Sequence, residues 1–297
     1  MEQLEREGRL VYSKSGMVYE KRYLDDSKGV AVQDWWDDIS MLRGIHASGE
    51  RLGYPTQKPE ALLERIIKAS SNEGDVVLDP FCGCGTAVAA AQNLKRRWIG
   101  IDITHLAVGL IKQRLHDKFG DAIKGTYAVH GEPTDIAGAR RLAEDDKFQF
   151  EAWALSLVGA RHAGQVRRGA DQGIDGRLYF HDDKSGKTKQ IILSVKGGHV
   201  TASQVRDLRG VIEREKAEIG VFITLENATK PMLKEAAQAG FYKSPYFERK
   251  FPRLQIFTIE QLLNGEVIQH PRMLETTFKK APKAKTEAAE NLALPLG

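Results

Sequence analysis

The chain has 297 residues, of which 41% are hydrophobic and 28% are charged, with a formal net charge of +4. This length and composition predict an ordinary globular protein with two cores. No apolar run approaches the length of a membrane span and the N-terminus lacks the apolar segment of a signal peptide, so we expect a cytoplasmic protein without a membrane partner. The mild basic excess is compatible with a polyanion partner and does not by itself argue for one.

The first predicted element is a β-hairpin. Residues 10–12 and 17–23 are short β-prone runs on either side of the polar stretch at 13–16. Such runs around a turn sequence ending in glycine are typical of two antiparallel strands.

A strand, a glycine turn, a helix and a second strand follow between residues 76 and 102. The apolar run at 76–78 is of the kind found in a buried parallel strand, and it is followed by Asp79, Gly83 and Gly85. The helix predicted at 86–94 begins with free N–H groups, and the strand predicted at 98–101 ends at Asp102. This order predicts a Rossmann-type nucleoside site, with the carboxylate of Asp102 accepting hydrogen bonds from both ribose hydroxyls.

Three segments in this order resemble the S-adenosylmethionine-binding half of the amino-DNA methyltransferases, which methylate adenine N6 or cytosine N4. They are the PTQKP segment at 55–59, LDPFCGCGT at 78–86 and the strand end at 99–103. The resemblance implies an α/β fold with a partial Rossmann-like methyltransferase sheet and S-adenosylmethionine as cofactor. It assigns to the cofactor the following residues: Asp79, Phe81, Gly83 and Gly85 to the methionine moiety and its loop, Asp102 to the ribose, and Thr56 and Lys58 to the region of the carboxylate.

Two features of this stretch have a second interpretation. A compact lysine cation is a natural partner of a carboxylate, but Lys58 taken alone is typical of a solvated residue at a helix start. Cys82 and Cys84 have the spacing of a metal pair, but the chain has 2 cysteines in total, so we interpret them as small turn residues.

The catalytic loop of the methyltransferase family, (D/N/S)PP(Y/F/W), is absent from the sequence. Its nearest string is SPYF at 244–247, which has one proline and lies far downstream. In the family that loop orients the target amine and stacks on the flipped base, so we expect this chain alone not to transfer methyl groups. We therefore expect a fragment or a split subunit, with a second polypeptide supplying the loop.

After Asp102 the pattern predicts an amphipathic helix at 106–119, a third strand of the same sheet at 127–130 and a polar helix at 136–146. We expect the domain boundary near residue 145. The first domain is then 1–145.

A second α/β domain is expected at 146–278, followed by a mobile tail at 279–297. The expected elements are a helix at 148–158, strands at 177–180 and 190–195 about a polar turn, a helix that ends at 216 and is capped by Thr201 or Ser203, a strand at 220–224 and a helix at 228–239.

This order resembles the catalytic core of Mrr-type restriction endonucleases of the PD-(D/E)xK superfamily. The resemblance implies that Asp175 holds Mg²⁺ and that Lys196 positions or activates water at the phosphate. Ser194 departs from the acid or amide expected two residues before the lysine, which puts cleavage in doubt. Side chains that could replace the missing ligand are listed here: Glu151, Glu213, Glu215 and Gln204.

Three functions remain open at this point. The first is the cofactor half of a DNA methyltransferase joined to a nuclease-like domain in a restriction-modification or defence system. The second is a non-catalytic module that binds double-stranded DNA or senses S-adenosylmethionine. The third is an Mg²⁺-dependent DNA endonuclease.

Overall fold

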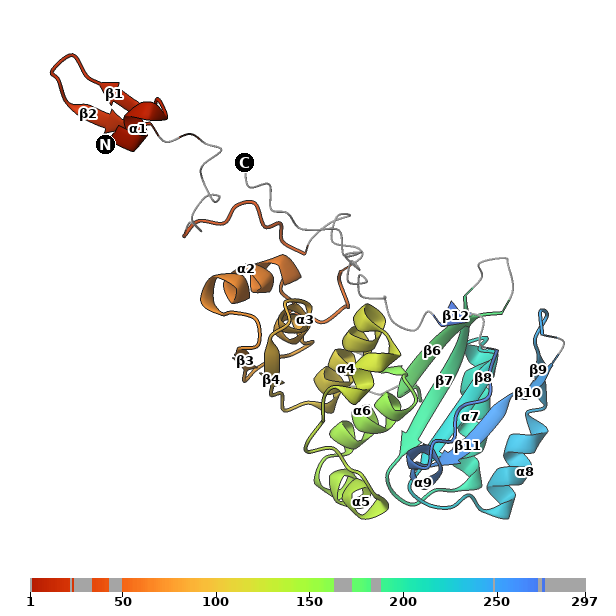
Figure 1. Cartoon of the computed structure of the whole chain (residues 1–297). Helices are drawn as coiled ribbons and strands as arrows, with labels where there is room; N and C mark the ends of the chain where they lie inside the picture. The colour runs from red at the N-terminus through yellow and green to blue at the C-terminus, as the bar shows by residue number, and fades with distance from the viewer. Residues whose placement is uncertain are drawn as a thin grey trace. The chain divides into compact units, whose positions relative to one another are not determined.

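The computed structural model describes residues 2–21, 23, 34–42, 50–162, 173–182, 188–247, 249–271 and 274–275 (Figure 1). The expected tail at 279–297 lies outside the described residues. The chain is mixed α/β with several sheets. In the described part of the chain, no helix is both long enough and apolar enough to cross a bilayer.

The chain divides into two compact units, of which the first comprises Met1–Asp38 and Lys285–Gly297. In it, helix α1 (Glu2–Arg6) is followed by strands β1 (Leu10–Tyr12) and β2 (Val18–Glu20). The two strands pair antiparallel with Leu10 opposite Glu20, which confirms the predicted hairpin.

The second unit, Ile39–Ala284, begins with the predicted strand, turn, helix and strand. Strands β3 (Val76–Asp79) and β4 (Arg97–Gly100) pair in parallel, with Leu78 opposite Ile99. The surrounding helices are α2 (Glu60–Ser70), α3 (Thr86–Asn93), α4 (His105–Phe119) and the 3₁₀ helix η3 (Asp121–Gly125). Val77 and Trp98 pack among α2 and α3, and Trp98 also contacts the cluster built on α4, so these helices cover one face of the strand pair.

The opposite face of β3 and β4 is exposed, and the expectation that these strands are buried is wrong. Val76, Leu78, Ile99 and Ile101 are between 48% and 59% exposed. Side chains alternate between the faces of a strand, so these residues project away from the helices that cover Val77 and Trp98. Nothing in the described part of the chain covers them.

The predicted third strand at 127–130 is also wrong. The chain reaches this position from η3, and residues 127–130 pair with no strand of the described sheets. The Tyr127 ring lies 5.7 Å from the Trp98 ring, so this segment packs against the helix-covered face of the strand pair. Hydrophobic packing of the aromatic side chain therefore replaces the expected backbone ladder.

The second sheet has the strand order β11-β8-β7-β6-β12, with β5 (Arg161–His162) also paired to β6. Strands β6 (Gly176–His181) and β7 (Lys189–Lys196) are antiparallel, whereas β7, β8 (Ile219–Thr224) and β11 (Leu254–Thr258) are parallel. The crossovers run through α7 (Ala202–Arg214) and α8 (Lys230–Gln238), and β9 (Phe241–Lys243) and β10 (Lys250–Pro252) form a small hairpin before β11. Strand β12 is Leu274–Glu275. The strands and helices predicted between 148 and 239 are confirmed.

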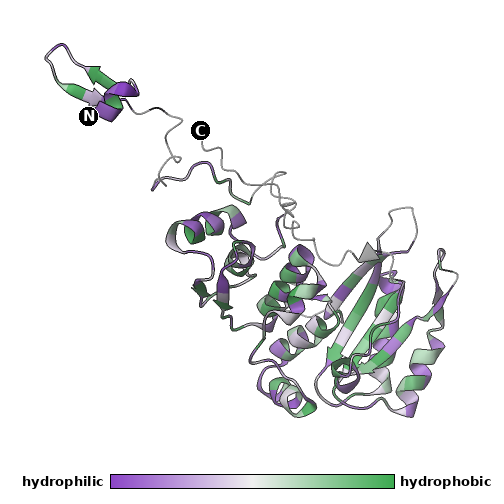
Figure 2. Ribbon diagram, in the orientation of Figure 1, coloured by the Kyte–Doolittle hydropathy of each residue, from purple (hydrophilic) through white to green (hydrophobic). Residues whose placement is uncertain are grey.

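Helices cover both faces of this sheet. One face packs against α5 (Ile136–Asp145), α6 (Lys147–Leu157) and α9 (Ile259–Leu263), and the other against α7 and α8. Figure 2 shows the hydrophobic stretches of β7 and β8 in the middle of this arrangement. Ala139 and Ala143 belong to the same core cluster as Phe150 and Trp153, so α5 packs with the second core.

A buried polar triad fixes the β9–β10 hairpin to the sheet. Asp182 is fully buried and pairs with the ammonium group of Lys189. The Tyr242 hydroxyl donates to Asp182 and lies 2.9 Å from Lys189 Nζ. Burial is the largest cause that raises the pKa of Tyr242 to about 12. Each polar group thus has a partner, as a buried network requires.

Candidate functional site

The glycine turn after β3 depends on left-handed backbone at two positions. Gly83 has φ of 49° and Gly85 has φ of 72°, and Gly85 is the N-cap of α3. A Cβ atom on Gly85 would lie 2.7 Å from Cγ1 of Ile111 on α4. Glycine is therefore needed at 85 both for its conformation and for its close approach to α4.

The carboxylate of Asp102 holds this turn from the end of β4. Its Oδ2 accepts the Gly83 N–H at 3.0 Å, and its Oδ1 accepts the backbone N–H of Thr104 at 2.9 Å and the Thr104 hydroxyl at 2.8 Å. At the end of β3, Asp79 Oδ1 accepts the Phe81 N–H at 3.1 Å. Asp102 thus joins the end of β4 to the turn after β3, and Asp79 holds the first residues of that turn.

The segment at 54–58 lies against this turn. A Cβ atom on Gly83 would lie 3.1 Å from Cε1 of Tyr54. The Gln57 side chain closes the segment, because its Oε1 accepts the Leu52 N–H and its amide donates to the Glu50 carbonyl, both at 2.8 Å. Tyr54 was missed by sequence reasoning. Its place directly before Pro55 in the motif is the signal that could have singled it out.

A cavity of about 220 Å³ lies between the 54–58 segment and the glycine turn. Its lining includes five of the seven residues predicted for the cofactor: Thr56, Lys58, Asp79, Phe81 and Gly83. The other two, Gly85 and Asp102, build the turn that forms one wall. The structure therefore brings the predicted residues together around one cavity, with the N-terminus of α3 at its edge.

Cys82 and Cys84 also line this cavity, and both are buried free thiols. Burial, followed by the nearby charge of Asp102, raises the pKa of Cys82 to about 11. Burial also raises the pKa of Cys84 and is its largest cause. Neutral thiols at physiological pH serve as small packing groups, because it is the thiolate that acts as a nucleophile or a metal ligand.

The nuclease-type residues meet at the carboxyl end of β7. Asp175 is 4% exposed, and its Oδ2 accepts hydrogen bonds from Val195 N–H at 2.6 Å and from Ser194 Oγ at 3.1 Å. Lys196 Nζ lies 3.3 Å from the same oxygen. This carboxylate is therefore neutralised and hydrogen-bonded by its own chain.

The side chains considered as substitute ligands have other partners. Glu215 pairs with Arg177 at 2.8 Å, Glu213 lies 3.8 Å from Arg209, and Gln204 forms a capping box with Thr201 at the start of α7. Within the described ranges, no group of three His, Cys, Asp or Glu side chains is placed to hold a metal ion.

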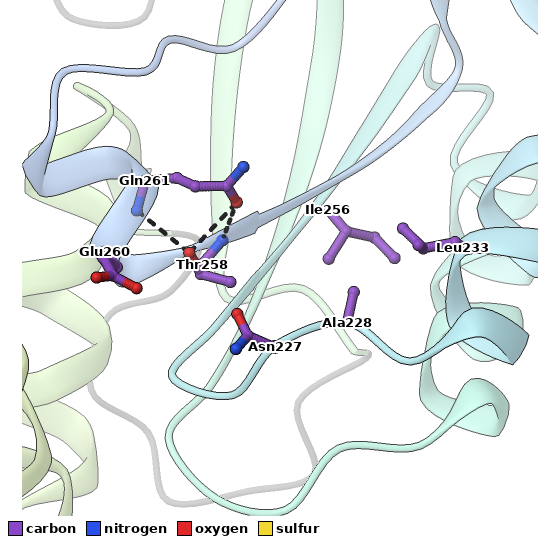
Figure 3. A pocket seen from close by; sticks show the side chains of 7 residues that line it. All are labelled: Asn227, Ala228, Leu233, Ile256, Thr258, Glu260 and Gln261. Atoms are coloured by element: carbon purple, nitrogen blue, oxygen red, sulfur yellow. Dashed lines mark hydrogen bonds between the residues drawn. The ribbon is translucent and has the colours of Figure 1, made fainter.

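A larger cavity, of about 480 Å³, lies at the carboxyl ends of β8 and β11 (Figure 3). Asn227 and Ala228 come from the loop before α8, and Leu233 from α8 itself; Thr258 and Gln261 cap α9 on the opposite side. None of the predicted site residues lines it, and its polar wall is largely engaged in the α9 cap.

Two family models match separate stretches of the chain. Residues 5–113 match the family model described as DNA methylase. Residues 148–264 match the model described as NACHT-associated inactive Restriction Endonuclease 1.

Curated relatives match part of the chain. The Type II methyltransferase M.EcaI of Enterobacter cloacae is 39% identical over 124 residues, which are 42% of this chain and 26% of the relative. M.HpaI of Haemophilus parainfluenzae is 42% identical over 29% of this chain and 32% of its own length. M2.DpnII of Streptococcus pneumoniae is 55% identical over 21% of this chain and 23% of its own length. The chain thus spans about a quarter to a third of these relatives.

A solved structure, described as MspJI Restriction Endonuclease in Complex with 27-mer Oligonucleotide, aligns with a TM-score of 0.32 and 16% identity. The alignment covers 59% of this chain and 36% of that one.

Replacing Gly85 with Ala tests the packing of the turn. We expect Gly85→Ala to lower the free energy of unfolding by about 2–4 kcal/mol, because left-handed strain adds to the clash with Ile111. Gly74→Ala is the matched control, since Gly74 has φ of 85° and no atom within 4 Å of its Cβ position. It should cost about 1 kcal/mol. Equal losses in chemical denaturation would show that the approach of α4 does not constrain the turn.

Proposed function

We propose that this chain has a role in DNA methylation within restriction-modification. It carries a DNA methylase domain at 5–113 and a restriction-endonuclease-associated domain at 148–264. In this proposal the first domain is 1–145, a partial Rossmann-like sheet that binds S-adenosylmethionine. The second is 146–278, which binds double-stranded DNA, and 279–297 is a tail. The observation that carries the proposal is the cavity between the 54–58 segment and the glycine turn held by Asp102.

The residues around this cavity fit the cofactor in chemistry. Lys58 Nζ donates to the Thr56 carbonyl at 3.0 Å, which leaves further ammonium protons for the carboxylate of the methionine moiety. Gly83 and Gly85 let the backbone approach the ligand, with Asp79 and Phe81 at the start of the turn. When bound, S-adenosylmethionine supplies the electrophilic methyl group.

Asp102 has a more limited capacity than the sequence alone predicts. A carboxylate offers about four acceptor positions. Gly83 N–H, Thr104 N–H and the Thr104 hydroxyl fill three of them, two on Oδ1 and one on Oδ2. We therefore assign one ribose hydroxyl to Asp102, at Oδ2, in place of both.

Calorimetry with S-adenosylhomocysteine tests the cofactor assignment. We expect Asp102→Ala to weaken binding by about 1.5–3 kcal/mol, since a charge-assisted hydrogen bond to the ribose is lost and the turn is released. Asp121→Ala is the control, because Asp121 is 82% exposed and pairs with Lys124. The 2′,3′-dideoxy analogue of S-adenosylhomocysteine separates the lost hydrogen bond from the released turn. It has no ribose hydroxyls, so Asp102→Ala should weaken its binding less than that of S-adenosylhomocysteine. Equal affinities of wild type and Asp102→Ala for S-adenosylhomocysteine would remove Asp102 from the site.

We further propose that the catalytic loop comes from a polypeptide outside these 297 residues. Two observations support this. The apolar face of β3 and β4 is uncovered in the described part of the chain, although parallel sheets are normally covered on both faces. The cavity of about 220 Å³ is also smaller than the ~300 Å³ typical of the smallest ligand pockets, which fits a site that lacks walls.

A radiolabelled-methyl assay on duplex DNA tests this arrangement. We expect no incorporation with the 297-residue chain alone, because no side chain or carbonyl of a DPPY-type loop is present to orient the target amine. Adding a polypeptide that carries such a loop should restore transfer. Stoichiometric incorporation by the chain alone would contradict the proposal.

For the second domain we propose DNA binding without cleavage. The residues at the carboxyl end of β7 fit Mg²⁺ poorly, because Asp175 is a single carboxylate that accepts from Ser194, Val195 and the Lys196 cation. The word "inactive" in the description of the matching family supports the same proposal. Asp175 and Lys196 are still the pair on which any cleavage would depend.

The variant Ser194→Glu tests this assignment. Ser194 Oγ lies 3.1 Å from Asp175 Oδ2, so a carboxylate at 194 would add the second Mg²⁺ ligand at the right place. We expect Ser194→Glu to gain Mg²⁺-dependent nicking of supercoiled plasmid, and Asp175→Ala or Lys196→Ala added to it to abolish that gain. Ser203→Glu, on the exposed start of α7, is the control. A folded Ser194→Glu protein with no activity would refute the nuclease-type assignment of this pair.

A further inference from the structure

Among the residues that the structure describes, one buried charge has no ion-pair partner. By whole-residue exposure, the charged residues buried in the described part of the chain are Arg114, Asp175, Asp182 and Lys189. Asp182 pairs with Lys189 and Asp175 pairs with Lys196. Arg114 is 2% exposed, and its Nε and Nη1 atoms are buried without a hydrogen-bond partner. A buried guanidinium without an anion is costly, because charges are desolvated only at a large penalty.

Arg114 lies on the side of α4 that faces the glycine turn. It follows Ile111 by three residues, so the two side chains lie on one face of the helix, and Ile111 is the residue against which Gly85 packs. The positive charge of Arg114 also opposes the burial-induced rise in the pKa of Cys84, which lines the cavity. The guanidinium is thus close to the wall of the cofactor cavity.

Glu50, an acidic group that interacts electrostatically with Arg114, is also engaged with other partners. Glu50 Oε1 accepts the Glu60 N–H at 2.6 Å, and Lys118 pairs with the carboxylate of Glu60. Arg114 and Lys118 both act to lower the pKa of Glu50, while burial, the largest cause, raises it. The Glu50 carboxylate therefore interacts electrostatically with both Arg114 and Lys118. Among the described residues, no carboxylate forms an ion pair with Arg114 alone.

We propose that Arg114 is a specificity-determining residue of the cofactor site: its buried charge selects ligands that carry an amino-acid carboxylate. The inference rests on the proposed cofactor function and deepens it. Lys58 is an exposed residue of the cavity lining, whereas Arg114 is buried and its charge acts on Cys84 of the same lining. A charge held in a low-dielectric wall acts on an anion more strongly than a solvated one. It also needs no reorganisation when the ligand enters.

The test compares two ligands that differ only in the carboxylate. S-adenosylhomocysteine carries it, and decarboxylated S-adenosylhomocysteine keeps the amine and lacks it. Dissociation constants are measured by calorimetry for the full chain, for Arg114→Met and for Arg114→Lys. Lys112→Met is the matched control, because Lys112 lies on the same helix and pairs with Glu132, an acid outside the cavity lining. Circular dichroism and thermal melts establish that each variant is folded.

We expect Arg114→Met to weaken S-adenosylhomocysteine binding by about 10- to 100-fold and to leave the decarboxylated ligand within about twofold, from the loss of one charge interaction at an intermediate dielectric. Arg114→Lys should retain most of the discrimination, and Lys112→Met all of it. Equal weakening of both ligands by Arg114→Met would make Arg114 a scaffold residue and overturn the inference. If Arg114→Met does not fold, Arg114→Gln takes its place, and equal weakening of both ligands by Arg114→Gln overturns the inference. A wild-type chain that binds neither ligand would overturn the proposed function itself.

Discussion

The hydrogen bond from the Gly83 amide to the Asp102 carboxylate is the constraint on which the first site depends. Gly83 and Gly85 have left-handed backbone conformations. Glycine adopts these about as readily as other conformations, so the residues alone do not fix the shape of the turn. Fixing the turn from the end of the neighbouring strand converts that permissive segment into a defined wall. The same carboxylate then has less capacity for a ligand, since most of its acceptor positions are filled. The hydrogen bonds by which Asp102 fixes the turn therefore limit how many hydrogen bonds Asp102 can accept from a ribose.

This small parallel pair is not a complete core, and the second sheet supports it. Helix α4, which braces the glycine turn through Ile111, packs on α6 of the second core: the His105 N–H donates to Gln149 Oε1 at 2.9 Å, and a Cβ atom on Gly109 would lie 3.2 Å from Cβ of Ser156. The second sheet is covered on both faces and has its buried charges paired. The well-packed nuclease-like core thus anchors the helix that positions the cofactor turn, whichever chemistry the second domain itself retains.

The sequence is sufficient to predict the structure where the local residue pattern and backbone chemistry agree. Glycine at 83 and 85, the strand and helix periodicities and the acid at 102 predict the turn and its neighbours, and the structure confirms their order and the parallel pairing of the strands. It failed where the outcome depends on what lies beside an element. The apolar pattern of a strand does not show whether another element covers that strand. The exposure of Leu78 and Ile99 is therefore not predicted by the sequence. Likewise, Tyr127 lies in a run typical of a strand, whereas its ring packs against Trp98 and residues 127–130 join no described sheet. The position of Tyr54 beside Gly83 and the burial of Arg114 depend on tertiary packing, which periodicity cannot reveal.

The two candidate sites differ in how far each carboxylate is already satisfied. Asp102 is partly exposed and keeps about one acceptor position, whereas Asp175 is buried, with three donors converging on a single oxygen and a lysine ammonium among them. A ligand hydroxyl can join the first arrangement without displacing anything. A divalent cation at the second carboxylate would lie beside the Lys196 ammonium, which is 3.3 Å from Asp175 Oδ2. Arg114 is the opposite case, a buried cation whose Nε and Nη1 have no hydrogen-bond partner among the described residues. The balance of satisfied and unsatisfied charges therefore favours ligand binding at the glycine turn and a structural role for the buried acid of the nuclease-like sheet.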